Sequence, residues 1–157
     1  MEPLRIAFKE WAAICEALAG GRQDVILRKG GVAEVGGEFR PEHAKFWLYP
    51  TFVHQQEGGL APEGEPYLAA ALASQPPPGV VRIRHIVEVL AVHCAMTLEE
   101  LLPLQTRHIW SAATVAQRFH YRTPGLYVLA VKVIEAPAFE FVETPAQAGC
   151  KTWVELA

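Results

Sequence analysis

The segment at residues 38–55, EFRPEHAKFWLYPTFVHQ, carries many of the side chains in this chain whose types and spacing could bind a ligand. Large aromatic rings alternate there with polar groups, and Arg40, His43, His54 and Gln55 occur at a density that packing alone does not require. Planar rings beside cationic and amide groups are typical of sites that hold a planar, polar molecule such as a base. The segment therefore predicts a binding site, although it does not define a reaction.

An alternating aromatic run within this segment could stack on a ligand. Alternation at residues 46–49 is typical of a strand, and it places Trp47 and Tyr49 on one face. If that face stays open, either ring could stack on a base or sugar while Arg28, Lys29 and Arg40 neutralise phosphates. Burial of both rings in the core is the alternative that this pattern leaves open.

A second group of cations and rings occurs at residues 117–122, QRFHYR. This segment is expected to end a helix, and the dipole of a helix stabilises a cation near its C-terminus, which is a sufficient structural explanation for Arg118. Arg122 has no such explanation. The candidate ligand-binding residues are therefore Arg28, Lys29, Arg40, His43, Trp47, Tyr49, His54, Gln55, Arg118 and Arg122.

The histidines raise the question of a metal site. His43 and His54 could be ligands, with a third from His85, His93 or a glutamate, because neutral imidazole is the commonest nitrogen ligand. Hydrogen bonding is the simpler interpretation, in which His54 caps a loop and His85 is a satisfied histidine on a buried face. The third interpretation is that these histidines contact a ligand directly, without a metal ion. We predict no metal site and no cofactor.

The signatures of common enzymes are absent: the sequence has no Walker loop, GxSxG elbow, HExxH helix or CxxC pair. This lowers the expectation of catalysis without deciding it. Asp24 is the only aspartate and asparagine is absent, so a hydrolytic metal site would have to use glutamate and histidine. The alternative function is therefore a metal-dependent nuclease or other phosphoester hydrolase, whose first candidates are Glu38, Glu42, His43 and His54.

Length and composition favour a single domain over residues 1–157. A chain of 157 residues with 51% hydrophobic content can bury one compact core. The net charge of −3 excludes a globally basic nucleic-acid coat protein, but nine of the 14 cations are arginine, which suits a local phosphate-binding patch. No apolar run is long enough to span a membrane, and the charged N-terminus lacks the apolar core of a secretory signal. We therefore expect a cytoplasmic protein.

Hydrophobic periodicity and breaker residues predict a mixture of helices and short strands. A helix is expected at residues 3–19, because Phe8, Trp11 and Cys15 fall on one face at helical spacing. Glycine pairs at residues 30–31 and 36–37 frame a predicted hairpin that leads into the aromatic strand. Other strands are expected at residues 24–29, 32–35, 80–93, 126–134, 139–142 and 153–156, and other helices at 67–74, 97–102 and 109–119. The pattern lacks a βαβ rhythm and indicates an α+β chain with six or seven strands.

Four motifs, in order FKEWAAICEAL, VILRKGGV, FWLYPTFVHQ and GCKTWVEL, closely resemble a bacterial family whose shared segment is a domain of unknown function, DUF1802. The resemblance covers nearly the whole chain. Its motifs are specific, but the function of the family is not established, so the resemblance implies no activity.

The order of elements supports a second resemblance. A helix leading into GGRQDVILRKG, a strand with VRIRHIVEV, a TLEEL helix and a late LYVLAVKV strand resemble PUA-like barrels, in particular the ASCH group. This resemblance implies a small, strongly bent barrel with helices at its ends, which binds RNA or modified bases in a cleft beside the first helix. Arg28 and Lys29 would lie near the rim of that cleft. The segment at residues 36–66 departs from the ASCH pattern, so only the fold and the ligand class are carried over.

These observations predict a single α+β domain with a mixed, strongly bent or partly closed sheet and flanking helices. The predicted function is a nucleic-acid or nucleotide-binding module with an aromatic and basic cleft. RNA, a modified base or single-stranded nucleic acid is the expected ligand, and no membrane partner is expected. A homodimer in which the aromatic segment forms the interface is a third interpretation, beside the hydrolase.

Overall fold

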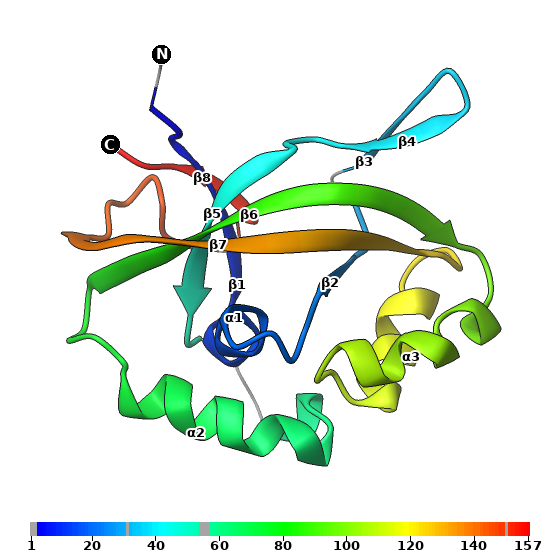
Figure 1. Ribbon diagram of the computed structural model, residues 1–157, viewed down its shortest axis with the longest axis horizontal. Coiled ribbons are helices and arrows are strands. Elements are labelled where there is room, and N and C mark those ends of the chain that lie inside the picture. Colours follow the sequence, from blue (N-terminus) through cyan, green and yellow to red (C-terminus); the bar gives the residue numbers. More distant parts are fainter. Residues whose placement is uncertain (1–2, 31, 54–56, 150) are drawn as a thin grey trace.

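The computed structural model describes residues 3–30, 32–53, 57–149 and 151–157, which form an α+β fold in which a bent sheet curves around a helix (Figure 1). The strands are β1 (Ile6–Trp11), β2 (Val25–Arg28), β3 (Val32–Val35), β4 (Glu38–Pro41), β5 (Lys45–Thr51), β6 (Val80–Ala95), β7 (Leu126–Val142) and β8 (Trp153–Glu155). The α-helices are α1 (Ala12–Ala19), α2 (Glu65–Ala73) and α3 (Ala112–His120), and short 3-10 helices cover Glu57–Gly59, Pro62–Gly64, Leu98–Glu100 and Leu102–Arg107. Among these residues, no helix is long and apolar enough to cross a membrane.

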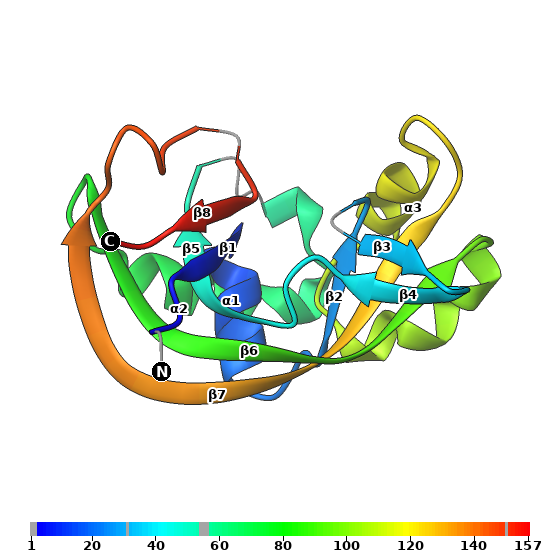
Figure 2. The same ribbon diagram turned by 90° about the horizontal axis from the view of Figure 1, so that it is seen from above.

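Six strands form one mixed sheet in the order β2-β7-β6-β5-β1-β8, and β3 and β4 form a separate hairpin. β1 and β5 run parallel, whereas the other neighbours are antiparallel. β6 and β7 are paired along most of their length and bend together, as Figure 2 shows, with register shifts between Ile83 and His85 and between Val89 and Ala91. Irregularities of this kind let a ladder bend and twist. β2 and β8 are the two edges of the sheet, so the sheet is not closed into a barrel, and the predicted mixed, bent α+β architecture is confirmed.

β1 corrects the helix expected at residues 3–19. The prediction holds for α1 but is wrong for residues 6–11, which lie between β5 and β8 and form ladder pairs with both. Two ladders satisfy the backbone of this segment, which outweighs the helical spacing of its apolar residues. The strand geometry places Phe8 and Glu10, two residues apart, on the same face.

Most other elements lie where the sequence predicts them. β3 and β4 form the expected hairpin, and its turn residues Gly36 and Gly37 have φ of 59° and 83°, a conformation that glycine adopts readily. Thr97 and Glu100 form the predicted capping box. The strands expected at residues 126–134 and 139–142 are one continuous strand, β7, so the described residues contain longer strands than expected.

α3 begins three residues later than the predicted start at residue 109. Ser111 is the N-cap, and its side chain accepts a hydrogen bond from the Thr114 backbone N–H at 3.1 Å. Ile109 and Trp110 precede the helix and are buried, with 0% and 1% of their surface exposed. Their apolar character therefore reflects core packing of a connecting segment rather than a helical face.

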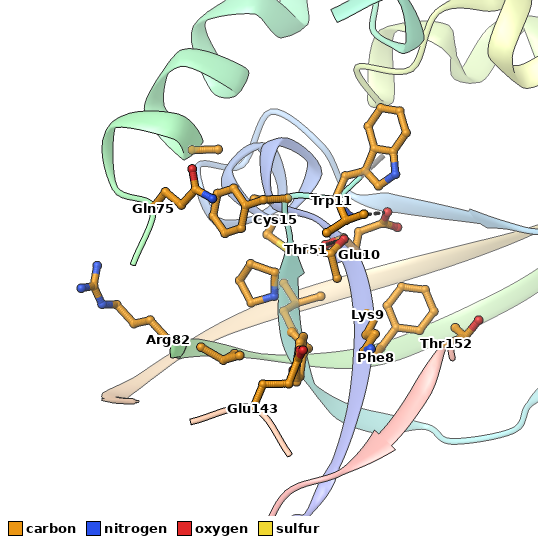
Figure 3. Close-up of a pocket in the computed structure, with 18 of the residues that line it drawn as sticks. Phe8, Lys9, Glu10, Trp11, Cys15, Thr51, Gln75, Arg82, Glu143 and Thr152 are labelled. Carbon is orange, nitrogen blue, oxygen red and sulfur yellow. Dashed lines mark hydrogen bonds between the residues drawn. The ribbon is translucent and has the colours of Figure 1, made fainter. Parts of the chain in front are cut away.

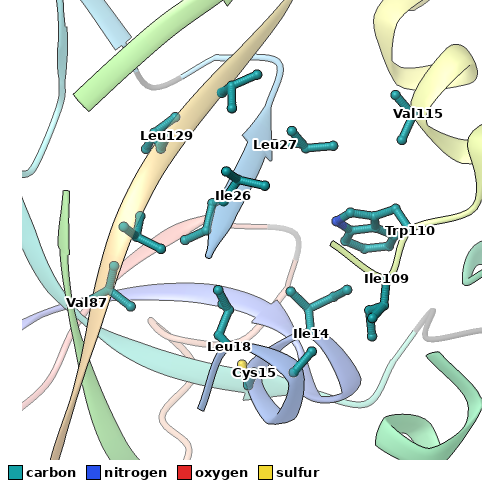
Figure 4. Packing of buried hydrophobic residues seen from close by; sticks show 14 of the residues in the cluster. Ile14, Cys15, Leu18, Ile26, Leu27, Val87, Ile109, Trp110, Val115 and Leu129 are labelled. Atoms are coloured by element: carbon teal, nitrogen blue, oxygen red, sulfur yellow. The ribbon is translucent and has the colours of Figure 1, made fainter. Parts of the chain in front are cut away.

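Two hydrophobic clusters hold the sheet and helices together, and β5 contributes to both. The larger cluster joins α1 to the sheet and to α3; Figure 4 shows Ile14 and Leu18 of α1 close to Ile26 of β2. The smaller cluster consists of Ala7, Tyr49, Val81, Ile83, Val154 and Leu156, with Trp47 and Phe141 packed against it. Both rings of the aromatic strand that could have stacked on a ligand, Trp47 and Tyr49, thus take part in core packing.

His108 is a buried polar residue beside the larger cluster, with 1% of its surface exposed. Its Nδ1 accepts a hydrogen bond from the Trp110 backbone N–H at 3.1 Å, which fixes the segment before α3. Burial, with a smaller contribution from Arg22, lowers the pKa of His108 from 6.5 to about 4. The residue is therefore neutral in the folded protein at physiological pH.

The lowered pKa of His108 predicts acid sensitivity. The unfolded chain binds a proton at this residue more tightly than the folded protein does, so the stability it contributes is present above pH 6.5 and is lost as pH falls toward about 4. We expect this residue to account for a loss of up to about 3 kcal/mol in the free energy of unfolding over that window. Denaturant unfolding at several pH values should show a flatter pH dependence for His108→Asn, which keeps an acceptor near the Nδ1 position. The exposed His120→Asn serves as the control, and an unchanged pH dependence in His108→Asn would contradict the assignment.

Candidate functional site

A cleft of about 750 Å³ opens where β1, α1 and the ends of β2 and β5 meet the segment that joins α2 to β6. Figure 3 shows Glu10, Trp11 and Thr51 toward one end and Gln75 and Arg82 toward the other, with Cys15 between them. A volume of this size lies within the range of roughly 300–1,000 Å³ that is common for small-molecule sites. Glu10, Arg28 and Arg118, from β1, β2 and α3, all line it and are called the charged cluster below.

Glu10 is the acidic member of the charged cluster and has 8% of its surface exposed. Its Oε1 accepts a hydrogen bond from the Trp11 backbone N–H at 2.9 Å. Burial raises its pKa, and Arg118, the Trp11 N–H and Arg28 oppose that shift. Among the described residues, neither guanidinium forms a direct ion pair with this carboxylate. The acid and the two cations therefore interact only over a longer distance.

Arg28 ends β2 and holds a half-buried guanidinium among aromatic rings. Its guanidinium carbon lies 4.7 Å from the centre of the Phe8 ring and 5.6 Å from that of Trp153. Its Nη1 is buried and has no hydrogen-bond partner in the described part of the chain. Burial lowers the pKa of Arg28, and Glu10 and Glu42 oppose the shift. An unpartnered, charged donor of this kind is costly unless something binds it.

Arg118 reaches the cleft from the last turn of α3. Its guanidinium carbon lies 3.9 Å from the centre of the Trp110 ring, a cation–π contact. Trp110 packs edge-on against Trp11, with ring centres 4.8 Å apart. Burial lowers the pKa of Arg118, and Glu10 opposes that shift. The position of Arg118 in the last turn suits the helix dipole, as predicted, but the side chain also contributes to the cleft.

Lys29 lines the cleft, but hydrogen bonds within the protein occupy its ammonium group. Its Nζ donates to the carbonyls of Phe119 and Gly125, both at 2.7 Å, and to that of Thr123. An ammonium group has three N–H donors, so this arrangement uses all of them. Lys29 thus ties the end of β2 to the end of α3 and fixes the distance between Arg28 and Arg118.

The aromatic residues predicted to bind ligand are anchored by hydrogen bonds. Tyr49 lines the cleft but has 1% of its surface exposed, and its hydroxyl donates to Glu143. Burial and this carboxylate raise the pKa of Tyr49. The Trp47 Nε1 donates to the Leu4 carbonyl at 2.8 Å.

The remaining predicted residues lie elsewhere. Arg40 is exposed on β4 and pairs with Glu38 at 3.6 Å. The His43 ring packs edge-on against Trp153, with centres 4.6 Å apart, and exposed Arg122 lies 5.1 Å from the Tyr121 ring. His54 and Gln55 lie outside the described residues. Of the predicted set, the structure brings Arg28, Lys29, Tyr49 and Arg118 to the cleft.

Glu10 is the site residue that sequence reasoning missed. Read as part of a helix, it lay on the polar face and drew no attention. Read as a strand, the sequence FKE places Phe8 and Glu10 on one face, and a carboxylate beside a core phenylalanine would have signalled a buried acid. Trp110 contacts Arg118, and Trp153 contacts Arg28. No pattern in the sequence marked either tryptophan as part of a site.

The described residues contain no group of three or more His, Cys, Asp or Glu side chains placed to hold a metal ion. Glu38, Glu42 and His43, three of the first candidates for a hydrolytic site, are therefore not gathered into such a group. The fourth, His54, lies outside the described residues.

Comparisons with known proteins identify a family and a fold. The sequence model of the family described as a domain of unknown function (DUF1802) matches residues 7–157. No curated protein matches the sequence.

Solved structures with a similar fold include the crystal structure of ASCH from Zymomonas mobilis. It has 10% sequence identity and a TM-score of 0.50, and the match covers 81% of this chain and 66% of that one. Two variants of the same protein match with TM-scores of 0.46 and 0.45 at 10% and 9% identity. At this identity the likeness shows the fold alone, and it confirms the predicted ASCH-type architecture.

The raised pKa of Glu10 predicts that the acid destabilises the protein at neutral pH. The folded protein binds a proton at this carboxyl more tightly than the unfolded chain does, so the stabilising contribution is present below the ordinary pKa of 4.5 and is lost as pH rises through the folded-state value. The shift already includes the attraction of both arginines, so an ionised Glu10 costs folding stability relative to a neutral side chain of the same shape. We expect Glu10→Gln to raise the free energy of unfolding at pH 7 by about 1 kcal/mol, with no gain below pH 4.5.

The measurement is thermal or urea unfolding at both pH values, with the exposed Glu99→Gln as the matched control. Glutamine keeps an acceptor for the Trp11 N–H, so the local backbone stays satisfied. A destabilised Glu10→Gln at pH 7 would show that the carboxylate holds the arginines in place more strongly than burial opposes it.

Proposed function

Because this chain belongs to the DUF1802 family and shares its fold with an ASCH protein, we propose that it is a nucleic-acid or nucleotide-binding module, with RNA as the ligand, that binds in the cleft beside α1. The observation that carries this proposal is Arg28. Its half-buried guanidinium lines the cleft and makes no hydrogen bond within the described residues; because its Nη1 is buried, Nε and Nη2 are the donors left for a ligand. A phosphate or a base edge supplies the acceptors that such a group needs.

The charge of the cleft supports the same ligand class. Seven lysine and arginine side chains line the cleft, against the three glutamates Glu10, Glu16 and Glu143, so its lining carries a surplus of positive charge. One of the seven, Arg84, is paired with Glu16 at 3.5 Å. The chain as a whole has a net charge of −3, so this basic character is local. A local positive cleft attracts a polyanion without making the whole surface adhere to it.

Aromatic rings in the cleft wall support binding of a planar group. Trp11 lines the cleft and is partly exposed, whereas Phe8, on the same strand, has 3% of its surface exposed and carries the Arg28 guanidinium on its ring. Stacking on aromatic rings is the usual way in which proteins hold unpaired bases. The proposed site therefore differs from the one predicted at the aromatic segment, because the rings come from β1 rather than from β5.

The other two interpretations receive less support. The hydrolase would need its acids and histidines together, and the described members of that set are not gathered. A dimer interface at the aromatic segment would need exposed rings, whereas Trp47 and Tyr49 pack against the smaller cluster. Metal analysis of the purified protein and its size in solution test these two directly.

The proposal predicts that Arg28 contributes to RNA affinity and that Arg40 does not. We expect Arg28→Ala to weaken binding of a labelled single-stranded RNA of mixed sequence by about tenfold or more, the scale of a lost charged hydrogen bond. Arg40→Ala is the matched control, because Arg40 is exposed on β4 and lies apart from the cleft residues. Fluorescence anisotropy at increasing salt should also show a steep loss of affinity for the parent protein.

Equal binding by Arg28→Ala and the parent would place any RNA site elsewhere. Absence of binding at low salt would remove the proposed function altogether. A circular dichroism spectrum and a melting curve for each variant separate loss of binding from loss of folding.

A further inference from the structure

The cleft lies along both faces of β1, near the end of the strand that leads into α1. Phe8 and Lys9 are neighbours on this strand, so their side chains point to opposite faces of the sheet, and both line the cleft. Phe8 belongs to the larger hydrophobic cluster. The Lys9 ammonium lies 5.3 Å from the centre of the Tyr49 ring, which belongs to the smaller cluster. The cleft therefore joins the two sides of the strand.

Each side of β1 carries a cation with free donors. On the Phe8 side, the Arg28 guanidinium carbon lies 4.7 Å from the centre of the Phe8 ring, and the described residues accept no hydrogen bond from this arginine side chain. On the Tyr49 side, Lys9 Nζ donates one hydrogen bond, to the Gly149 carbonyl at 3.0 Å. An ammonium group has three N–H donors, so two remain. Donors for a ligand therefore stand on both sides of the strand, with its backbone between them.

The loop between β7 and β8 holds a second lysine beside Lys9. Lys151 is exposed, and its Nζ donates to the Ala146 carbonyl at 2.8 Å. The same loop is tied to β1, because the Lys9 backbone N–H donates to the Thr152 carbonyl at 2.8 Å and the Lys9 side chain reaches Gly149. Hydrogen bonds to residues 146, 149 and 152 thus place both ammonium groups at one short loop.

These two lysines differ from other cations of the cleft in having no acidic partner. Arg82 and Arg84 form ion pairs at 2.9 and 3.5 Å. Lys9 and Lys151 form no ion pair with any residue that the structure describes. Glu143 also lines the cleft, but its carboxylate is hydrogen-bonded to a tyrosine hydroxyl and to neither lysine. Both ammonium groups are therefore free to balance the charge of a ligand.

The phosphate groups of one nucleotide are adjacent, so they reach cations on one side of β1 only. A single-stranded nucleic acid carries a phosphate at every nucleotide and can place successive phosphates on both sides. We propose that the cleft takes a segment of single-stranded RNA whose backbone passes the end of β1, with one phosphate at Arg28 and others at Lys9 and Lys151. This inference rests on the cleft being the RNA site proposed above. It identifies the ligand as a chain of several nucleotides rather than a free nucleotide.

Phosphate contacts of this kind have a measurable signature. They position a strand without reading its sequence, so they act alike on every base. Each neutralised phosphate of a single strand releases counterions and adds about 0.7 to the slope with which log affinity falls against log salt concentration. Two lysine contacts therefore account for roughly 1.4 of that slope.

The first experiment compares chain lengths by competition against a labelled uridine octanucleotide, measured by fluorescence anisotropy with the whole chain. The competitors are uridine 5′-monophosphate, uridine 5′-triphosphate and oligouridylates of two, four and eight nucleotides. We expect the tetranucleotide to bind about tenfold or more tightly than the monophosphate, the scale of one added contact between charged groups. The triphosphate, whose phosphates are adjacent, should not reproduce this gain.

The decisive variant combines Lys9→Met and Lys151→Met, because methionine is unbranched and apolar and removes only the charged end of each side chain. We expect about tenfold weaker binding of the octanucleotide at low salt, a salt slope reduced by roughly 1.4, and unchanged affinity for the monophosphate. Lys132→Met is the matched control, because Lys132 is exposed on β7 and does not line the cleft. Lys9→Arg keeps the charge and should keep most of the affinity.

A melting curve for each variant shows whether it folds. If the double variant does not, Lys151→Met alone changes an exposed side chain and should reduce the salt slope by about 0.7. An octanucleotide that binds no more tightly than the monophosphate, or a lysine variant with the salt slope of the parent, would overturn the backbone path. If Arg28→Ala still weakens RNA binding in that case, the proposed function stands. If neither the oligouridylates nor the RNA of mixed sequence bind at low salt, both are overturned.

Discussion

The ladder between β6 and β7 is the constraint on which the rest of the molecule depends. These two strands span Val80–Ala95 and Leu126–Val142, and every other strand of the main sheet attaches to one of them directly or through a neighbour. Because the ladder bends, its two ends face the same interior, where α1 is buried. β2 pairs with one part of the ladder and β5 with another, so residues near the ends of β2 and β1 are brought to one cleft. The bend therefore creates the site.

The charged cluster combines buried charges with few direct contacts between them. Burial shifts the pKa of Glu10 upward and those of Arg28 and Arg118 downward, so each group is shifted toward its neutral form. Two direct ion pairs, one from each arginine to Glu10, would have offset more of that cost, yet neither pair forms among the described residues. Buried charges that are neither paired nor replaced by apolar residues are a recurring property of sites that bind ligands, because the ligand completes their contacts.

The sequence predicts helices, strands and turns well where neighbouring residues determine the local structure. It predicts them poorly where pairing with a segment far away in the sequence determines it. The capping box at Thr97 and the glycine turn at Gly36 are local, and both form as expected. The segment at residues 6–11 has apolar residues at helical spacing, but pairing with β5 and β8 makes it a strand, and no local pattern contains that information. Because residues 6–11 were predicted as helix, Glu10 was assigned to a polar helical face and was not recognised as a buried acid. Arg28 was identified as a cation near the aromatic segment and, through the ASCH resemblance, near the rim of the cleft, whereas its aromatic anchors come from β1 and β8, which only the folded chain brings near it.

The two arginines of the charged cluster do not close onto Glu10, because other contacts hold them in place before a ligand binds. Glu10 attracts both arginines, and in a flexible chain they would close onto it and remove the free donors. Ring contacts hold each guanidinium instead, and Lys29 bonds to three carbonyls at the end of α3, which fixes the helix that carries Arg118 relative to β2. Groups held in place before binding lose little conformational entropy when a ligand arrives. Lys29 and Arg28 are adjacent in the sequence but differ in role. Lys29 connects β2 to the end of α3 through hydrogen bonds, whereas the Arg28 guanidinium keeps donors that the described residues do not bond.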